Sequence, residues 1–259
     1  MIKIITSYWF YLAVFILLLC SSFIGRRIGK WKISRQKENE LGIIGVAEGA
    51  VFALLGLLIA FTFSGAYDRF QTRKIHIIDE ANAYQTAYLG INLLTTRTQA
   101  DLRDTFKHYL DSRLLVYKLV AIGGPSLSDQ LKNSDNIKRM LWSQVIAATE
   151  ATHNDTVTSL VIPGVYAMFD AADGGYQMTR VHPPLVIFCL LLALATLGSF
   201  LSGYSTAEKK ADTNLYIFSY VLITSVTIFL IINLEYPRMG KIKVSDFDKV
   251  LIEVRNKWN

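Results

Sequence analysis

One carboxylate lies inside a long apolar stretch of this chain. Residues 43–63 read IIGVAEGAVFALLGLLIAFTF, and Glu48 is the single charged residue among them. An α-helix rises about 1.5 Å per residue, so this stretch can cross a hydrocarbon core about 30 Å thick. A charge within such a span costs roughly 2.5 kcal/mol or more, so it normally faces other protein or water rather than lipid.

Glu48 therefore has two interpretations. It could face a pore, where a ring of Glu48 side chains would attract cations and repel anions. Alternatively, it lies at the membrane interface or forms a hydrogen bond to a Ser or Thr of the fourth apolar span. In the pore interpretation, the residues on the same helical face would line the pore as well: Phe52, Leu55, Ile59 and Thr62. The three apolar members of this group could form a gate that closes by dewetting.

The same helix carries a second face made of small residues. Gly45, Gly49 and Gly56, together with Ala53 and Ala60, recur at spacings of three and four. Small residues at this spacing let helix backbones approach closely in lipid. This face is predicted to pack against another helix, and the stretch as a whole is predicted to be an inner helix that lines the axis of an assembly.

A second polar group follows further along the chain. Asp79, Glu80 and Asn82 offer oxygen atoms of the kind that bind a hard cation. Their spacing lacks the loop of a calcium-binding hand. A solvated helix surface is therefore the alternative interpretation of this group.

The spacing of other reactive residues supports no further chemistry. The four histidines are scattered without the spacing of metal ligands: His76, His108, His153 and His182. We recognise no nucleophile with a base, no paired carboxylates and no glycine-rich phosphate loop. Cys20 and Cys189 lie in apolar runs without a CxxC pair, which predicts buried free thiols. We predict no metal, no cofactor and no enzymatic activity.

The elements that must position these residues are mostly membrane spans. Of the 259 residues 52% are apolar, with a mean hydropathy of +0.32, and the apolar residues concentrate in four runs: 4–24, 43–63, 185–201 and 215–234. Arg26 and Arg27 follow the first run, which is the wrong order for a cleaved signal peptide, so this run is predicted to be a transmembrane helix. The predicted fold is an all-α integral membrane protein with four transmembrane helices and a helical extramembrane domain between helices two and three.

The chain then divides into four predicted parts. Residues 1–65 hold the first two spans and a basic loop, residues 66–181 the extramembrane domain, residues 182–236 the last two spans, and residues 237–259 an amphipathic tail.

The extramembrane domain is predicted to be helical because apolar residues recur at three and four along residues 66–122. We expect the second span to continue out of the bilayer and to turn near residues 95–98. Further helices are expected over residues 129–151 and after Asn154, the last one kinked or split at Pro163 and ending at residues 173–175. The tail could lie on the membrane or pack on the domain, and Arg238 is expected to pair with a carboxylate of the domain.

The net charge of +6 is compatible with an acidic surface as partner. The basic residues flank apolar spans without a nucleic-acid motif, which excludes nucleic acid. Six of them fall in residues 26–42, predicted to be a topogenic loop or an anionic-lipid site: Arg26, Arg27, Lys30, Lys32, Arg35 and Lys37. Short basic loops stay in the cytoplasm, which favours an outside position for residues 66–181.

Five segments together resemble the bacterial bestrophin-like family. They are GRR at 25–27, ENELGIIGVAEGAVFALLGLLIAFTFSGAYDRF at 38–70, DEANAYQTAYLGINLL at 79–94, HPP at 182–184, and LEYPRMGKIKVSDFDKVL at 234–251. The resemblance implies the architecture of bestrophin chloride channels, which form rings around a pore lined by their second span. It also implies a cytoplasmic domain, in conflict with the charge rule. A ring of Glu48 fits a chloride channel poorly.

The sequence thus predicts a homo-oligomeric, channel-like protein of the bacterial inner (plasma) membrane, with its second span lining the axis. Its predicted partners are copies of itself in a ring, the lipid bilayer and small inorganic ions, with the ion selectivity left open. The alternative is a non-conducting membrane sensor or scaffold that binds a partner through its helical domain.

Overall fold

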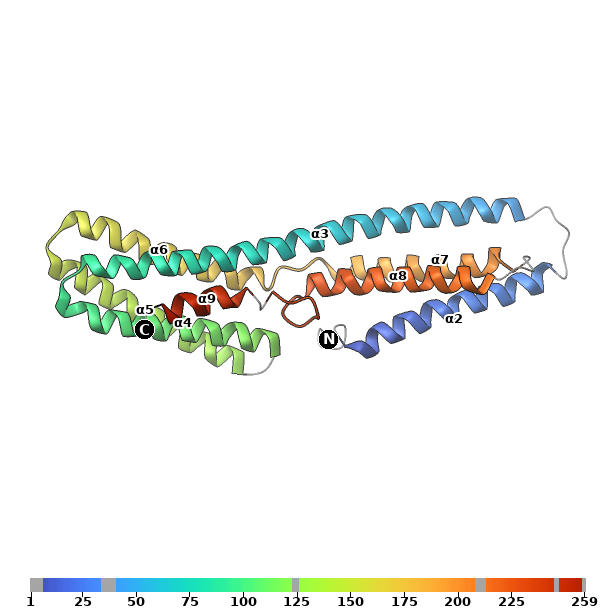
Figure 1. Ribbon diagram of the computed structural model, residues 1–259. Helices are drawn as coiled ribbons and strands as arrows, with labels where there is room; N and C mark the ends of the chain where they lie inside the picture. Colours follow the sequence, from blue (N-terminus) through green and yellow to red (C-terminus); the bar gives the residue numbers. More distant parts are fainter. Residues whose placement is uncertain (1–6, 34–40, 123–125, 208–212, 245–246, 258–259) are drawn as a thin grey trace. The chain divides into compact units, whose positions relative to one another are not determined.

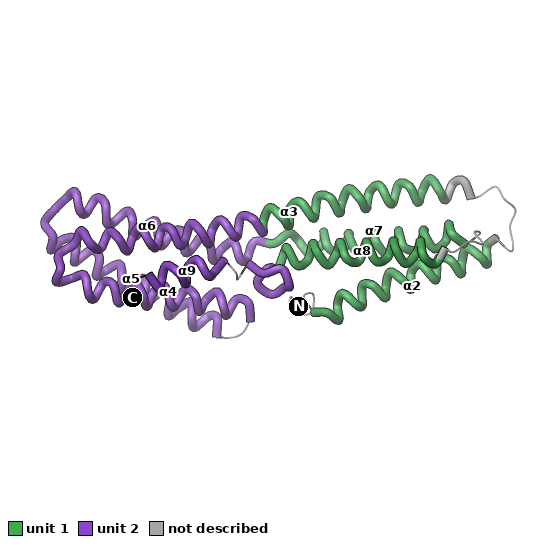
Figure 2. The backbone as a smooth tube through the Cα atoms, in the orientation of Figure 1, with its two compact units in different colours: residues 1–69, 182–236 green, residues 70–181, 237–259 purple. Residues whose placement is uncertain are grey.

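The computed structural model describes residues 7–33, 41–122, 126–207, 213–244 and 247–257, and it divides into two compact units. Unit 1 comprises residues 1–69 and 182–236, and unit 2 comprises residues 70–181 and 237–259 (Figure 2). The regular structure of the described residues is entirely helical.

Unit 1 contains α2 (Tyr8–Ile33), the first part of α3 (Leu41–Gly90), α7 (Leu185–Ser205) and α8 (Thr213–Glu235) (Figure 1). All four helices are long and apolar enough to cross a membrane. The prediction of an all-helical protein with four membrane spans is confirmed. At about 1.5 Å per residue, the 50 residues of α3 are far longer than a bilayer requires.

Helix α2 extends beyond its predicted end. The prediction of a loop starting at residue 26 is wrong, because the helix continues to Ile33. Two glycines in this part of α2 face α7. A methyl group at Gly25 would meet the carbonyl oxygen of Phe200 at 2.0 Å, and one at Gly29 would meet the Cβ of Ala207 at 2.6 Å. Close packing on α7 therefore accounts for the extra turns.

The backbones of α2 and α7 approach each other closely between Ser22 and Gly29. A methyl group at Gly203 would lie 1.9 Å from the carbonyl oxygen of Ser22, so the two backbones approach each other there. The Ser22 hydroxyl donates to the Ser199 carbonyl at 2.9 Å. Small residues thus allow the approach, and hydroxyls form hydrogen bonds across it, as is usual between helices in lipid.

Unit 2 contains the rest of α3, a short 3₁₀ turn (Ile91–Leu93), α4 (Thr96–Ile122), α5 (Ser126–Thr152), α6 (Asp155–Met178) and α9 (Asp248–Asn256). Its core is rich in buried aromatic residues: Tyr84, Phe106, Tyr109, Tyr117 and Phe169. The Asn154 side chain caps α6 by accepting from the backbone N–H groups of Thr156 and Val157.

Helix α6 is continuous through Pro163, so of the two alternatives expected there the split is excluded. The expected end at residues 173–175 is wrong, because the helix continues to Met178. Gly175 is part of the packed helix rather than of a turn. A methyl group at this position would meet the Tyr117 hydroxyl at 2.6 Å and Glu80 Oε2 at 3.1 Å.

The C-terminal tail packs on unit 2. Leu251 and Val254 of α9 are buried in the unit's core together with Val244. The Arg255 guanidinium contacts both carboxylate oxygens of Asp111 on α4, at 2.9 and 3.1 Å. Of the two placements expected for the tail, the structure has the one against the helical domain.

Candidate functional site

The helix face that carries Glu48 contacts α7 and α8 of the same chain. Ser205 on α7 donates its hydroxyl to Glu48 Oε1 at 3.1 Å. One turn further on, the Phe52 ring packs on Tyr220 of α8, with ring centroids 5.3 Å apart. Leu55 is only 3% exposed. Ser205 lies at the end of the third span, whereas the sequence predicted a partner on the fourth.

The remaining members of this face are partly buried. Ile59 and Thr62 continue the same side of α3. The Thr62 hydroxyl donates to the carbonyl of Leu58 at 2.7 Å, so its hydrogen bond stays within the helix. The pore role of Glu48 and of these residues stays a prediction.

The small-residue face of α3 points away from the other helices of unit 1. At Gly45, Gly49 and Gly56, an added methyl group would have no neighbouring atom within 4 Å. In the most apolar part of α3 only 6% of residues are buried, compared with 28% in α2 and 33% in both α7 and α8. Within its own chain, α3 is the least covered span.

A second site lies at the end of unit 1 where α7 begins and α8 ends. The Glu235 carboxylate is fully buried and accepts from Arg69 of α3, through Nε at 2.8 Å and Nη2 at 2.7 Å. His182 Nδ1 is 2.9 Å from Glu235 Oε1, and its ring lies 4.5 Å from that of Tyr236. We call Arg69, His182 and Glu235 the charged cluster.

The charged cluster borders a cavity of about 200 Å³. Its other walls are mostly apolar: Leu58, Phe61, Thr62, Gly65, Pro183, Ile187, Phe188 and Ile231. Sequence reasoning missed this site. The signal was present, because each member of the cluster is an ionisable residue next to the end of an apolar span, and such residues are expected to pair with one another.

A buried ionic network occupies the core of unit 2. Glu80 of α3 is completely buried, 3.3 Å from Arg113 Nε on α4, and it accepts from the Tyr117 hydroxyl. Arg113 also donates to the carbonyl of Ala172 on α6. Burial raises the pKa of Tyr117, and the Glu80 carboxylate raises it further, so this hydroxyl keeps its proton and remains a donor.

The network also includes the tail. The Arg238 guanidinium lies 4.1 Å from the centre of the Tyr117 ring, close enough for a cation–π interaction. Its carboxylate partner is Asp248, at 2.9 Å, which belongs to the tail itself. The expectation of a partner in the helical domain is therefore wrong, and the contact with the domain is aromatic.

The structure separates the oxygen-rich group predicted at Asp79, Glu80 and Asn82. Glu80 points into the core of unit 2, whereas the other two are exposed. Among the described residues, no three His, Cys, Asp or Glu side chains are placed to hold a metal ion together.

These features define a class: an all-helical membrane protein with two spans, a helical domain and two further spans. Residues 15–247 match the family model described as a bestrophin-like domain. The chain belongs to the bestrophin-like family.

Solved structures with this fold include a bacterial bestrophin homologue from Klebsiella pneumoniae. A point variant of that protein is 12% identical, with a TM-score of 0.75 over 96% of this chain and 98% of the other. Another crystal structure of the homologue is 14% identical, with a TM-score of 0.73 over 95% and 98%. A structure described as a membrane protein is 15% identical, with a TM-score of 0.69 over 94% and 98%. No curated protein matches the sequence.

Proposed function

We propose that this chain forms a ring-like homo-oligomeric ion channel of the bacterial inner membrane, with α3 lining the axis. The observation that carries the proposal is the low coverage of α3, in whose apolar part 6% of residues are buried. The exposed surface of a membrane-spanning helix must face lipid, other copies of the chain or a water-filled pore. Membership of the bestrophin-like family favours copies around a pore.

The exposed face of α3 is the part of the helix that is available to the axis. Ala53 lies on this face, and Leu55 lies on the opposite face against α7 and α8. Small side chains would leave room for ions and allow neighbouring copies to approach. Glu48 starts from the covered face but is itself only partly buried, so at that end of the span a ring of its carboxylates would border the axis and favour cations over anions.

Flux through liposomes containing the purified protein tests the proposal. The wild-type protein is expected to pass small inorganic ions, and Glu48→Gln is expected to lower the preference for cations. An intact oligomer that passes no small ion would contradict the channel and leave the alternative, a non-conducting sensor or scaffold.

Introduced cysteines test which face lines the path. In a Cys20→Ser, Cys189→Ser background, Ala53→Cys and Leu55→Cys are matched probes two residues apart. A charged thiol reagent is expected to block flux through Ala53→Cys and to leave Leu55→Cys conducting. Block of Leu55→Cys alone would instead place on the pore the side of α3 that packs on α7 and α8 within one chain, and block of neither would show that α3 does not line the path.

A further inference from the structure

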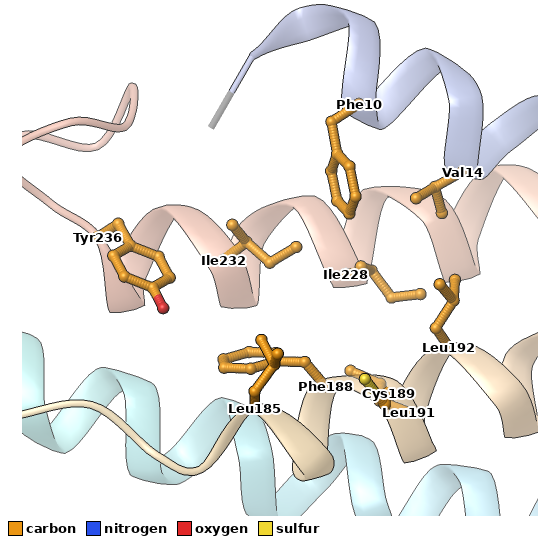
Figure 3. Close-up of a pocket in the computed structure, with 10 residues that line it drawn as sticks. All are labelled: Phe10, Val14, Leu185, Phe188, Cys189, Leu191, Leu192, Ile228, Ile232 and Tyr236. Atoms are coloured by element: carbon orange, nitrogen blue, oxygen red, sulfur yellow. The ribbon is translucent and has the colours of Figure 1, made fainter. Parts of the chain in front are cut away.

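An apolar cavity of about 230 Å³ lies among α2, α7 and α8 of unit 1 (Figure 3). Helix α2 contributes Phe10 and Val14, α8 contributes Ile228 and Ile232, and Tyr236 follows the last residue of α8. The remaining lining comes from α7: Leu185, Phe188, Cys189, Leu191 and Leu192. No side chain of this lining carries a charge.

The cavity has a buried floor and an exposed rim. On the floor, Leu191 is 1% exposed and Ile232 is 4% exposed. On the rim, Leu185 is 50% exposed and Cys189 is exposed as well. Because Cys20 is also exposed, the prediction of buried thiols is wrong at both positions. The cavity therefore opens on the outer surface of a unit whose helices span the membrane.

The walls determine what can fill this space. An apolar cavity of about 150 Å³ stays dry and binds benzene or xenon, so a larger one with apolar walls also excludes water. An empty space would deprive the side chains that line it of dispersion contacts, which favours occupation by an apolar group. At the surface of a membrane span, that group is the acyl chain of a lipid.

One end of the cavity is polar. Tyr236 forms this end, and its ring packs on His182 at 4.5 Å. His182 in turn contacts Glu235 in the charged cluster. Phe188 lines both this cavity and the one beside the charged cluster. A ligand that suits this site has an apolar chain and a polar head, with the head at the Tyr236 end.

We propose that this cavity is a binding site for one acyl chain of a membrane phospholipid, with the headgroup at the end where Tyr236 lines the cavity and packs on His182. A phospholipid is the occupant because the rim opens on the bilayer, whose main component it is. The site depends only on contacts within unit 1 and is independent of whether the protein conducts ions.

Photochemical labelling in lipid nanodiscs tests the site. The full-length protein is reconstituted with a phospholipid that carries a diazirine on one acyl chain, and the adducts are mapped by mass spectrometry after illumination. Adducts are expected at the cavity walls on α7 and α8. Ile232→Trp fills the floor and is expected to reduce them several-fold, whereas Ile223→Trp, on an exposed part of the same helix, is expected to leave them unchanged.

Cys189 provides a second readout that does not depend on the lipid probe. In Cys20→Ser protein, an apolar thiol reagent is expected to react several-fold more slowly at Cys189 when phospholipid is bound. In Cys189→Ser protein, reaction at the remaining Cys20 is expected to be unaffected.

Several results would overturn the proposal. These are equal labelling of the Ile232→Trp and wild-type proteins, labelling by a photoactivatable free fatty acid but not by the phospholipid, and cross-links from Cys189 to a second copy of the chain. A folded Ile232→Trp protein with unchanged Cys189 reactivity would likewise contradict it.

Discussion

Among the ion pairs of the described residues, Arg113 supplies the single positive charge that directly contacts Glu80. The Glu80 carboxylate is buried in unit 2. Arg113→Met removes this partner and leaves the carboxylate in the core. Removing one member of a buried pair costs about 3–5 kcal/mol, so we expect a large fall in the thermal unfolding temperature. Size-exclusion chromatography of detergent-solubilised protein after heating measures it.

The matched variant is the double substitution Arg113→Met, Glu80→Gln. It removes the unpaired charge along with its partner and is expected to recover part of the lost stability. Equal stability of the single and double variants would show that leaving Glu80 without Arg113 does not destabilise the protein.

Adjacent glycines of α6 differ in what they contact. Gly175→Ala places a methyl group 2.6 Å from the Tyr117 hydroxyl and is expected to destabilise the protein by about 1–3 kcal/mol. Gly174→Ala meets nothing closer than His76 at 3.9 Å and is expected to be neutral or stabilising, because alanine favours a helix by about 0.5–1 kcal/mol. Thermal unfolding of the two variants distinguishes them, and similar midpoints would contradict the contact.

Which residues are polar and buried was harder to predict than which segments are helical. Glu80 looked like one member of an exposed group, since Asp79 and Asn82 are its sequence neighbours. Its burial follows from contacts with Arg113 and Tyr117, more than thirty residues away along the chain. The charged cluster escaped prediction for the same reason, because Arg69 and Glu235 meet only in the folded unit.

At the scale of the helices, the close contact in unit 1 is between α2 and α7. Gly203→Ala would push a methyl group to 1.9 Å from the backbone of α2, so we expect at least about 1–3 kcal/mol of destabilisation. Gly49→Ala on α3 meets no atom within 4 Å and is the matched control. Both are measured by thermal unfolding.

The control variant Gly49→Ala also tests the proposed assembly. If α3 packs between copies, Gly49→Ala is expected to weaken the oligomer in native mass spectrometry while leaving the unfolding of the single chain unchanged. An unfolding midpoint as low as that of Gly203→Ala would show that Gly49 packs within the chain.

The spans were predictable because a run of apolar residues is a local property of the sequence. The ends of helices were not, because they depend on contacts between helices. Gly25 and Gly29 allow the extra turns of α2 to pack on α7. Gly175 likewise allows α6 to pack on Tyr117 and Glu80 where the sequence predicted a turn. The sequence likewise indicated small residues as packing positions, but the closest contacts proved to be at Gly25 and Gly203 rather than on α3.

At the scale of the whole chain, the last helix belongs to the core of unit 2. Leu251 is fully buried, so Leu251→Ala is expected to lower the free energy of unfolding by about 2–5 kcal/mol. Ile252 beside it is 39% exposed, and Ile252→Ala is expected to cost clearly less. Limited proteolysis measures the opening of unit 2. Equal cleavage of the two variants would show that the tail does not stabilise the unit.

The position of α9 also determines when unit 2 can finish folding during synthesis. Val244, Leu251 and Val254 complete a core whose other residues come from α3 to α6, yet the ribosome makes them only after both α7 and α8. Until then the nascent domain exposes the apolar surface that the tail will cover, which chaperones and proteases recognise. The core of this domain can therefore be completed only after α7 and α8 have been made, and a chain interrupted between α7 and the tail would leave that apolar surface exposed.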